Sequence, residues 1–203
     1  MKHPDYIDGR SVRLRPAVGS DRRMIYEGLA QSDVSGFLLT DPTTGQPRAL
    51  SYEAFRSDYV DYYFDDSHPE LGRCFVIEVD GRPVGQVNYN DIERDANRTE
   101  LDIWMFAERH CGHGWGSEAV RLLCDYLHRH MGVHGFYIKP SASNTRAVRG
   151  YEKAGFVRTV LPDDEAIAAY GPREDPDTVF MTRNVEVPDP VYAPPPAPPE
   201  SGT

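Results

Sequence analysis

The spacing of hydrophobic residues along the chain switches between the two-residue period of strands and the 3.6-residue period of helices. Apolar and polar residues alternate in 99–106, for example, whereas apolar positions recur every three or four residues in 117–132. The predicted elements, in chain order, are a strand at 11–16, helices at 19–32 and 51–66, strands at 74–79, 83–92 and 99–106, a helix at 117–132, a strand at 135–140, a helix at 144–156 and a strand at 177–185. This order predicts a mixed α/β fold with at least some antiparallel pairing.

Residues with strong local preferences mark the ends of these elements. Asp80-Gly81 predicts a tight hairpin turn between the first two of the three consecutive strands. Glycines that favour a left-handed backbone predict helix ends at Gly132 and Gly155. The candidate N-terminal caps of the helices are Ser20, Ser51 and Asn144.

The C-terminal segment 187–203 differs in composition from the rest of the chain. It holds seven of the 17 prolines and few residues that could pack into a core. We expect it to be an extended or disordered Pro-rich tail, and we expect residues 1–186 to form one domain.

Charge and cysteine usage narrow the class of function. The chain has 203 residues and a formal net charge of −10, which disfavours a nucleic-acid partner because phosphates need a basic face. The acidity fits a cationic partner, but on charge alone it fits better a surface that keeps the protein soluble. No apolar run is long enough to predict a membrane span, and no signal peptide is expected. The three cysteines predict free thiols in the cytoplasm, and the histidines lack the spacing of a metal site.

A glycine stands at every second position in the stretch CGHGWGS at 111–117, just before a predicted helix. A P-loop would need a Lys after the last glycine, where Ser117 stands, and a dinucleotide fingerprint would need the third glycine one residue later. Two interpretations stay open. The stretch forms a tight turn, or its unpaired amides and the positive end of the helix dipole bind an anion such as a pyrophosphate.

The stretch PSASNTRAVRGYEKAGF at 140–156 closely resembles a signature of the GCN5-related N-acetyltransferase (GNAT) family, in which an Asn opens a helix ending in Y-E-K-x-G-F. The stretch CGHGWGSEAV at 111–120 resembles the same family's acetyl-CoA loop, R-G-x-G-x-G. The resemblance spans residues 10–185. It implies a mixed α/β fold with a centrally splayed β-sheet, flanked by helices on both faces, and acetyl-CoA as co-substrate. Cys111 departs from the pattern, because the family usually has Arg or Gln there.

The resemblance also implies roles for the matching positions. The cofactor-binding residues would be Trp104, Met105, Phe106, Cys111, Gly112, His113, Gly114, Trp115, Gly116, Ser117, Asn144, Ala147 and Tyr151. Asp102 would be the general base, and Glu100, on the same face of the strand, its partner or a ligand of the substrate. Tyr151 would protonate the departing thiolate. Both carboxylates, Glu100 more than Asp102, also fit exposed positions of an alternating strand, and direct transfer needs no nucleophile at Cys111.

The sequence ELDIWM at 100–105, taken with the downstream signature, looks most like aminoglycoside 6'-N-acetyltransferases, which implies a small cationic amine as acceptor. An acidic, aromatic segment precedes it, in which Tyr59, Tyr62 and Tyr63 would contact ring faces. The candidate substrate-binding residues are Asp58, Tyr62, Asp65, Asp66, Glu100 and Asp102. The same charges fit a solvated helix face, and Lys139 would repel a cation if it faced the site.

Two other functions stay open. A ribosomal-protein-type N-terminal peptide acetyltransferase fits the N-terminal stretch 9–31 equally well. A non-catalytic acyl-CoA-binding module is the third hypothesis, and the presence of Asp102 and Tyr151 argues against it. We expect a monomer or a homodimer with no membrane or nucleic-acid partner.

Overall fold

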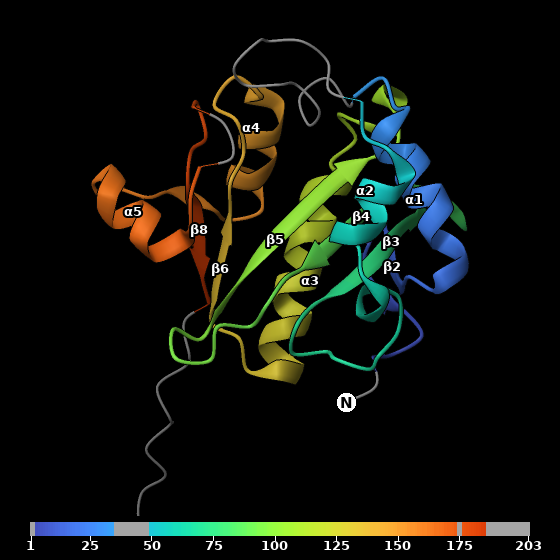
Figure 1. Cartoon of the computed structure of the whole chain (residues 1–203), viewed down its shortest axis with the longest axis horizontal. Coiled ribbons are helices and arrows are strands. Elements are labelled where there is room, and N and C mark those ends of the chain that lie inside the picture. The colour runs from blue at the N-terminus through green and yellow to red at the C-terminus, as the bar shows by residue number, and fades with distance from the viewer. Residues whose placement is uncertain (1–2, 35–48, 174–175, 186–203) are drawn as a thin grey trace, which may run out of the picture.

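An eight-stranded sheet forms the centre of the computed structural model, which describes residues 3–34, 49–173 and 176–185 (Figure 1). The strands lie in the order β1-β2-β3-β4-β5-β6-β8-β7. Neighbouring strands are antiparallel except β5 and β6, which are parallel. Their bounds are β1 Ile7–Asp8, β2 Arg13–Pro16, β3 Arg73–Val79, β4 Arg82–Tyr89, β5 Arg98–Met105, β6 Gly135–Ile138, β7 Val157–Arg158 and β8 Met181–Asn184.

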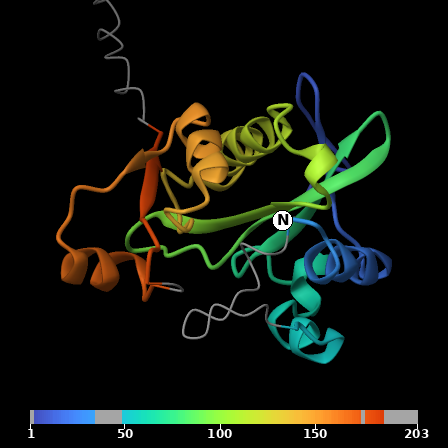
Figure 2. The same cartoon turned by 90° about the horizontal axis from the view of Figure 1, so that it is seen from above.

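Helices cover both faces of this sheet, as predicted (Figure 2). Helices α3 (Trp115–Met131) and α4 (Thr145–Lys153) lie on one face, and α1 (Arg22–Ala30) and α2 (Tyr52–Asp58) lie on the other. Helix α5 (Asp163–Tyr170) falls between β7 and β8 in the chain. Each face has its own apolar core, the larger one beneath α3 and α4.

The sheet splits at its centre, between β5 and β6. In the described chain β5 pairs with β6 only over Arg98–Glu100, opposite 135–137, although β5 itself continues to Met105. Beyond Glu100 it pairs with β4 alone. Pro140, which has no N–H to donate, follows soon after the end of β6. The two strands diverge in Figure 1, and the centrally splayed sheet is confirmed.

Most of the locally encoded ends form as predicted. The side-chain oxygens of Ser51 and Asn144 each accept a backbone N–H of the first helical turn at 3.1 Å. Gly132 and Gly155 have left-handed backbones, with φ of 69° and 92°. Helix α3 buries most of its predicted stripe, and Met131 at its end is only partly buried. The fully buried members of the stripe are Ala119, Val120, Leu123 and Leu127.

The predicted cap at Ser20 is wrong. Residues Gly19–Asp21 form a short 3-10 helix in which the Asp21 carboxylate accepts the N–H of Val18 at 2.8 Å. Helix α1 begins only at Arg22. Asp21 is the residue before α1, and its side chain makes no cap hydrogen bond to that helix because it bonds back to Val18 instead.

The single helix predicted at 51–66 is two pieces. Helix α2 ends at Asp58, Val60 has an extended backbone, and a 3-10 helix spans Asp61–Phe64. Across the interruption, Tyr59 and Tyr63 stack with ring centroids 5.2 Å apart. The Tyr59 hydroxyl donates to Asn88 in β4, and the Tyr63 hydroxyl donates to Asn90 just after β4. These bonds were not predicted from the sequence.

In the described part of the chain, two strands, one α-helix and the 3-10 helix Glu108–His110 were not predicted from the sequence. Strands β1 and β7 have two residues each, too few to show a period. Helix α5 buries only Ala166 and so shows no apolar stripe. The Pro-rich tail at 187–203 lies outside the described residues. Within the described part, none of the helices has the length and apolar character needed to cross a membrane.

Candidate active site

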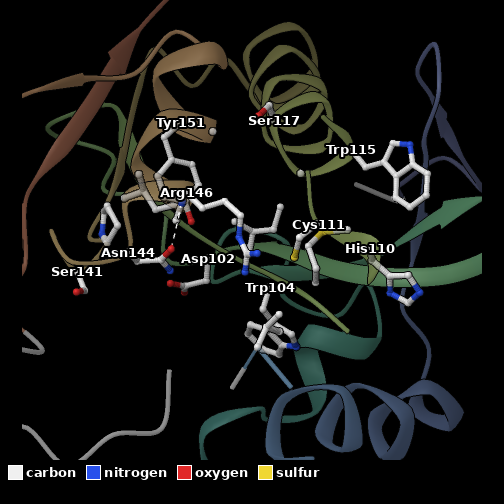
Figure 3. Close-up of a pocket in the computed structure, with 18 of the residues that line it drawn as sticks. Asp102, Trp104, His110, Cys111, Trp115, Ser117, Ser141, Asn144, Arg146 and Tyr151 are labelled. Atoms are coloured by element: carbon white, nitrogen blue, oxygen red, sulfur yellow. Dashed lines mark hydrogen bonds between the residues drawn. The ribbon is translucent and has the colours of Figure 1, made fainter. Parts of the chain in front are cut away.

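A cavity of about 790 Å³ opens where β5 and β6 diverge (Figure 3). The glycine loop, the first turn of α3, the end of β6 and helix α4 form one part of its wall. Residues of α1, of the end of α2 and of β4 and β5 form the other part. Helices α1 and α2 cover the opposite face of the sheet from α3 and α4. The cavity therefore connects both faces, and two substrates can approach each other through the split.

The glycine loop has the geometry of an anion site. Gly112 and Gly114 have φ of +81° and +85°, and a Cβ at either would meet no atom within 4 Å. Glycine is thus needed there for the backbone conformation rather than for space. Helix α3 begins at Trp115, and the N–H groups of its first turn have no partner within the helix. These amides lie at the positive end of a 17-residue helix, which suits a pyrophosphate.

Basic side chains of α4 add positive charge on the same side. Arg146, Arg149 and Lys153 line the cavity. Arg146 also forms an ion pair with Glu108, which precedes the glycine loop, so α4 and the loop are joined across the cavity. The backbone amides and these cations fit the phosphate groups of coenzyme A.

The backbone of β5 offers hydrogen bonds to the gap only at alternate residues. Asn90 donates to the Glu100 carbonyl, and Phe106 donates to the Val84 carbonyl, both at 2.9 Å. Antiparallel pairs alternate, so even-numbered residues of β5 bond to β4. The amide of Phe106 is therefore used within the sheet, and Trp104 stands at a position of the same kind, so neither amide is free for the predicted bond to a ligand. The backbone groups of Ile103 and Met105 face the gap instead.

Asp102 lines the cavity at the centre of a hydrogen-bonded cluster of side chains. Its Oδ2 accepts from the amide of Asn90 at 2.9 Å and from that of Asn88 at 3.4 Å. The hydroxyls of Tyr59 and Tyr63 donate to these two amides, each at 2.9 Å. Burial is the largest cause that raises the pKa of both tyrosine hydroxyls, and nearby groups that include Asp102 raise it further. Both tyrosines therefore stay protonated.

Glu100 is not paired with Asp102. Its carboxylate lies 2.9 Å from the ammonium of Lys139, and both side chains are largely buried. Lys139 lines the cavity, whereas Glu100 does not. The sequence raised the concern that Lys139 would repel a cationic acceptor. In the structure the Glu100 carboxylate compensates that positive charge.

Tyr151 lines the cavity from α4 (Figure 3). Burial raises the pKa of its hydroxyl, and the Asp102 carboxylate raises it further. Tyr151 is therefore a protonated donor at neutral pH. Asn144 and Ala147 line the same part of the wall, and the Asn144 side-chain oxygen is already used as the cap of α4.

Cys111 lines the cavity as a free, partly buried thiol. Its Sγ lies 3.7 Å from the Ala107 carbonyl. Burial raises the pKa of this thiol, although Arg146 acts in the opposite direction. A raised pKa disfavours the thiolate, so the environment is that of a wall residue and not of an activated nucleophile.

The remaining predicted residues divide into two groups. Trp104, Met105, Trp115, Gly116 and Ser117 line the cavity, as does Asp58 at the end of α2. His113 and Tyr62 do not. His113 stacks on Trp115 with centroids 4.4 Å apart, and Tyr62 packs on Tyr63.

Asp65 and Asp66 also lie outside the cavity. Asp65 accepts from the amide of Ser67 at 2.8 Å and from its hydroxyl at 2.5 Å. Asp66 forms an ion pair at 3.0 Å with Arg73, whose side chain is 4% exposed. These carboxylates serve a turn and a buried cation, and this placement gives no support to their predicted role as substrate ligands.

Sequence reasoning missed the two asparagines and Ile103. A signal was present, since Gln86, Asn88 and Asn90 alternate along the strand before Asp102. Their side chains share one face, which α2 and the following 3-10 helix cover. No group of His, Cys, Asp or Glu in the described ranges is arranged to hold a metal ion.

Comparison with known proteins identifies the family. Residues 11–157 match the family model described as acetyltransferase (GNAT) domain. The chain is 28% identical over 146 residues to spermidine N(1)-acetyltransferase of Escherichia coli K12, covering 72% of this chain and 73% of that protein. It is 29% identical over 170 residues to aminoglycoside N(6')-acetyltransferase type 1 of Klebsiella pneumoniae, covering 77% of this chain and 81% of that protein.

Solved structures agree with this fold. An aminoglycoside acetyltransferase in complex with coenzyme A superposes with a TM-score of 0.63 at 24% identity, over 86% of this chain and 95% of that one. A spermidine N-acetyltransferase from Vibrio cholerae with CoA and spermine also gives 0.63, at 21% identity and the same coverage. Together with the match over residues 11–157, the split sheet and the glycine loop before α3 show that this chain belongs to the GNAT acetyltransferase family.

Proposed function

We propose that this enzyme transfers an acetyl group from acetyl-CoA directly to a primary amine of a small cationic acceptor. The observation that supports it best is the division of charge within the cavity. One end has the N-terminus of α3 and the basic side chains of α4, and the other has the carboxylates of Asp58 and Asp102. The first end suits phosphates and the second suits an ammonium group.

The donor would bind along the wall formed by the loop, α4 and β5. Backbone amides from Gly112 to Ser117 would hold the pyrophosphate of coenzyme A, whereas the predicted amide of Cys111 already donates to the Glu108 carbonyl at 2.9 Å. The backbone groups of Ile103 and Met105 would bond to the pantetheine arm and stabilise negative charge that develops on the acetyl oxygen. Asn144 and Ala147 would line the far side of the arm.

The acceptor would approach from the face covered by α1 and α2. Its ammonium group must lose a proton before the nitrogen can attack, and Asp102 would accept that proton directly or through water. The new C–N bond forms as the C–S bond breaks. Tyr151, which stays protonated at neutral pH, would then donate a proton to the leaving thiolate. As the amide forms, the nitrogen gives its second proton through water to the Tyr151 phenolate, and Asp102 releases the first proton to solvent.

Charge at the acceptor end favours a small amine with more than one positive group. Asp58 and Asp102 line the cavity, while Lys139 compensates Glu100. The curated relatives are named for spermidine and for aminoglycosides, both of which carry several amines. We expect an acceptor of this polycationic class, acetylated in the cytoplasm, where free thiols such as those of this chain persist. If an aminoglycoside is the acceptor, expression of the enzyme would confer antibiotic resistance.

An acetylation screen tests the proposal. Acetyl-CoA is incubated with the purified chain and spermidine, kanamycin or an N-terminal peptide, and release of free thiol is followed against a sample without acceptor. We expect turnover with at least one of the two small polycations. Activity on the peptide alone would favour the N-terminal acetyltransferase, and acetyl-CoA binding without turnover on any amine would favour the binding module.

Asp102→Asn provides the matched variant. This substitution keeps the shape of the side chain but removes the base, so we expect kcat to fall about 100-fold or more, within the range of general-base catalysis, with little change in acetyl-CoA binding. A wild-type rate in Asp102→Asn at every pH from about 6 to 9 would contradict the role of Asp102.

A further inference from the structure

Asn88 and Asn90 lie beside Asp102 in a row of polar side chains on one face of the sheet. Asn88 is the direct cross-strand partner of Asp102 in the β4–β5 ladder, and Asn90 lies opposite Glu100. Cross-strand partners place their side chains on the same face. Asn88 is only 1% exposed, so its amide must find its hydrogen bonds inside the protein.

The direction of every bond in this cluster follows from the charge of Asp102. An ionised carboxylate only accepts, so both amides must present their NH₂ groups to Oδ2. Asn88 also donates to the Oδ1 of Asn90 at 2.8 Å. The two amide oxygens then need donors, and the hydroxyls of Tyr59 and Tyr63 supply them. Reversing either amide would place its oxygen against the carboxylate.

The cluster holds one carboxylate oxygen and not the other. Both amide contacts are to Oδ2, and the described residues place no hydrogen bond on Oδ1. Asp102 lines the cavity, so the oxygen without a bond is available to a ligand.

We propose that Asn88 and Asn90 are positioning residues that hold Asp102 by its Oδ2 and leave Oδ1 to receive the proton of the acceptor amine. Tyr59 and Tyr63 act one step further out, because they fix the orientation of the two amides. This inference rests on the proposed role of Asp102 as the base.

The hydrogen-bonded cluster around Asp102 joins two separate parts of the chain. The tyrosines come from the interrupted segment that follows α2, whereas the asparagines and Asp102 belong to the β4–β5 hairpin. Tyr59 also packs edge-on against Trp104 at 5.7 Å, so the helical layer is seated on the same strand as the base. Correct docking of this segment is thereby required for the geometry of Asp102.

Single substitutions give the first test. Asn90→Ala removes a hydrogen bond to a charged group, for which we expect kcat to fall about 10- to 100-fold with the acetyl-CoA dissociation constant unchanged. Tyr63→Phe removes a hydroxyl that acts only through Asn90, so a loss of about three- to tenfold is expected. Tyr26→Phe is the matched control. It removes a hydroxyl of the same apolar cluster that bonds to the Leu50 carbonyl at 2.9 Å, and kcat should stay at the wild-type value.

Asn90→Asp separates positioning from packing. Aspartate has the shape of asparagine but cannot donate when ionised, and it adds a like charge beside Asp102. Positioning predicts that kcat at neutral pH falls at least as far as in Asn90→Ala. A merely structural role predicts the reverse, because aspartate leaves no void.

A double-mutant cycle with Asp102→Asn decides whether Asn90 acts through the base. We expect Asn90→Ala to lower kcat of the wild type but to have little further effect in Asp102→Asn. Losses that multiply in the double variant, or a wild-type kcat in Asn90→Ala, would overturn the inference.

Failure of the proposed function gives a different pattern. If Asp102→Asn itself keeps the wild-type rate, or no amine is acetylated, then Asp102 is not shown to be a base. In that case a double-mutant cycle measured on the midpoint of urea unfolding tests whether Asn90 and Asp102 interact, independently of catalysis. Non-additive shifts for Asn90→Ala and Asp102→Asn support the inference, and additive shifts overturn it.

Discussion

Replacement of Asp66 by alanine should destabilise the protein without changing how it binds an amine. Asp66 belongs to the acidic run that, from the sequence alone, looked like a surface for cations. In the structure it forms an ion pair at 3.0 Å with Arg73, whose side chain is 4% exposed. The same guanidinium donates to the carbonyls of Ala17 and Tyr63, both at 2.6 Å. Asp66→Ala would leave that buried cation with neutral partners only.

The expected loss follows from the burial of the two partners. Removing one member of a fully buried pair costs about 3–5 kcal/mol. The Asp66 side chain is 24% exposed, so water can partly replace it, and we expect a loss of about 2–3 kcal/mol of unfolding free energy. With a urea slope of about 2–3 kcal/mol per molar, the midpoint should fall by about 1 M. Asp65→Ala, which removes an exposed turn carboxylate, should change stability by only about 0.5 kcal/mol.

Urea unfolding followed by tryptophan fluorescence measures this difference, because the chain has two tryptophans, Trp104 and Trp115. Acetylation kinetics at low temperature measure the acceptor KM of the same variants. We expect KM to be unchanged in Asp65→Ala and Asp66→Ala but raised in Asp58→Ala, whose carboxylate lines the cavity. Equal stability losses for Asp65→Ala and Asp66→Ala, or a raised KM in either, would refute the reasoning.

Three further predictions concern the loop, the thiol and the N-terminus. Gly114→Ala imposes strain of about 1–2 kcal/mol at φ +85°, so acetyl-CoA should bind about tenfold more weakly by calorimetry, whereas Gly81→Ala, at φ +71° in a distant hairpin turn, should leave binding unchanged. Cys111→Ser should keep kcat within about threefold, because loss of a true nucleophile costs several orders of magnitude. Burial lowers the pKa of His3 from 6.5 to about 4, beside the hydroxyls of Tyr89 and Tyr126. The unfolded chain therefore binds the proton more tightly, so stability is complete above pH 6.5 and falls as the pH drops towards 4, by on the order of 3 kcal/mol. Unfolding free energies from pH 4 to 7.5 should show a shallower slope in His3→Gln, and parallel slopes would contradict this assignment.

Sequence patterns were sufficient where a feature depends on neighbours in the chain. The stripe of α3 and its end at Gly132, the hairpin turn at Asp80-Gly81 and the cap at Asn144 all follow from spacing and local backbone preference. The glycine loop is of the same kind, because its left-handed residues and the helix start that follows lie within a few positions of each other. Local encoding also explains why the family motifs are readable without a structure.

Charge assignments depended on residues far apart in the sequence. Asp58, Asp65 and Asp66 are equivalent as sequence letters, yet only Asp58 lines the cavity. Glu100 and Asp102 share a strand face, but Glu100 pairs with Lys139 and Asp102 with two asparagines. Such partners are set by the register of paired strands and by the docking of helices, neither of which has a local sequence signal.

The sequence by itself therefore determined the family, the order of the longer strands and helices, and the position of the anion loop. Only the tertiary structure decided which amides of β5 face the gap, since that depends on which strand edge β4 occupies. It also decided which acidic groups remain for an acceptor and which are paired internally. The physical reason is that periodicity specifies the faces of an element, whereas hydrogen bonds and ion pairs between elements depend on register and burial, which form only when the chain is folded.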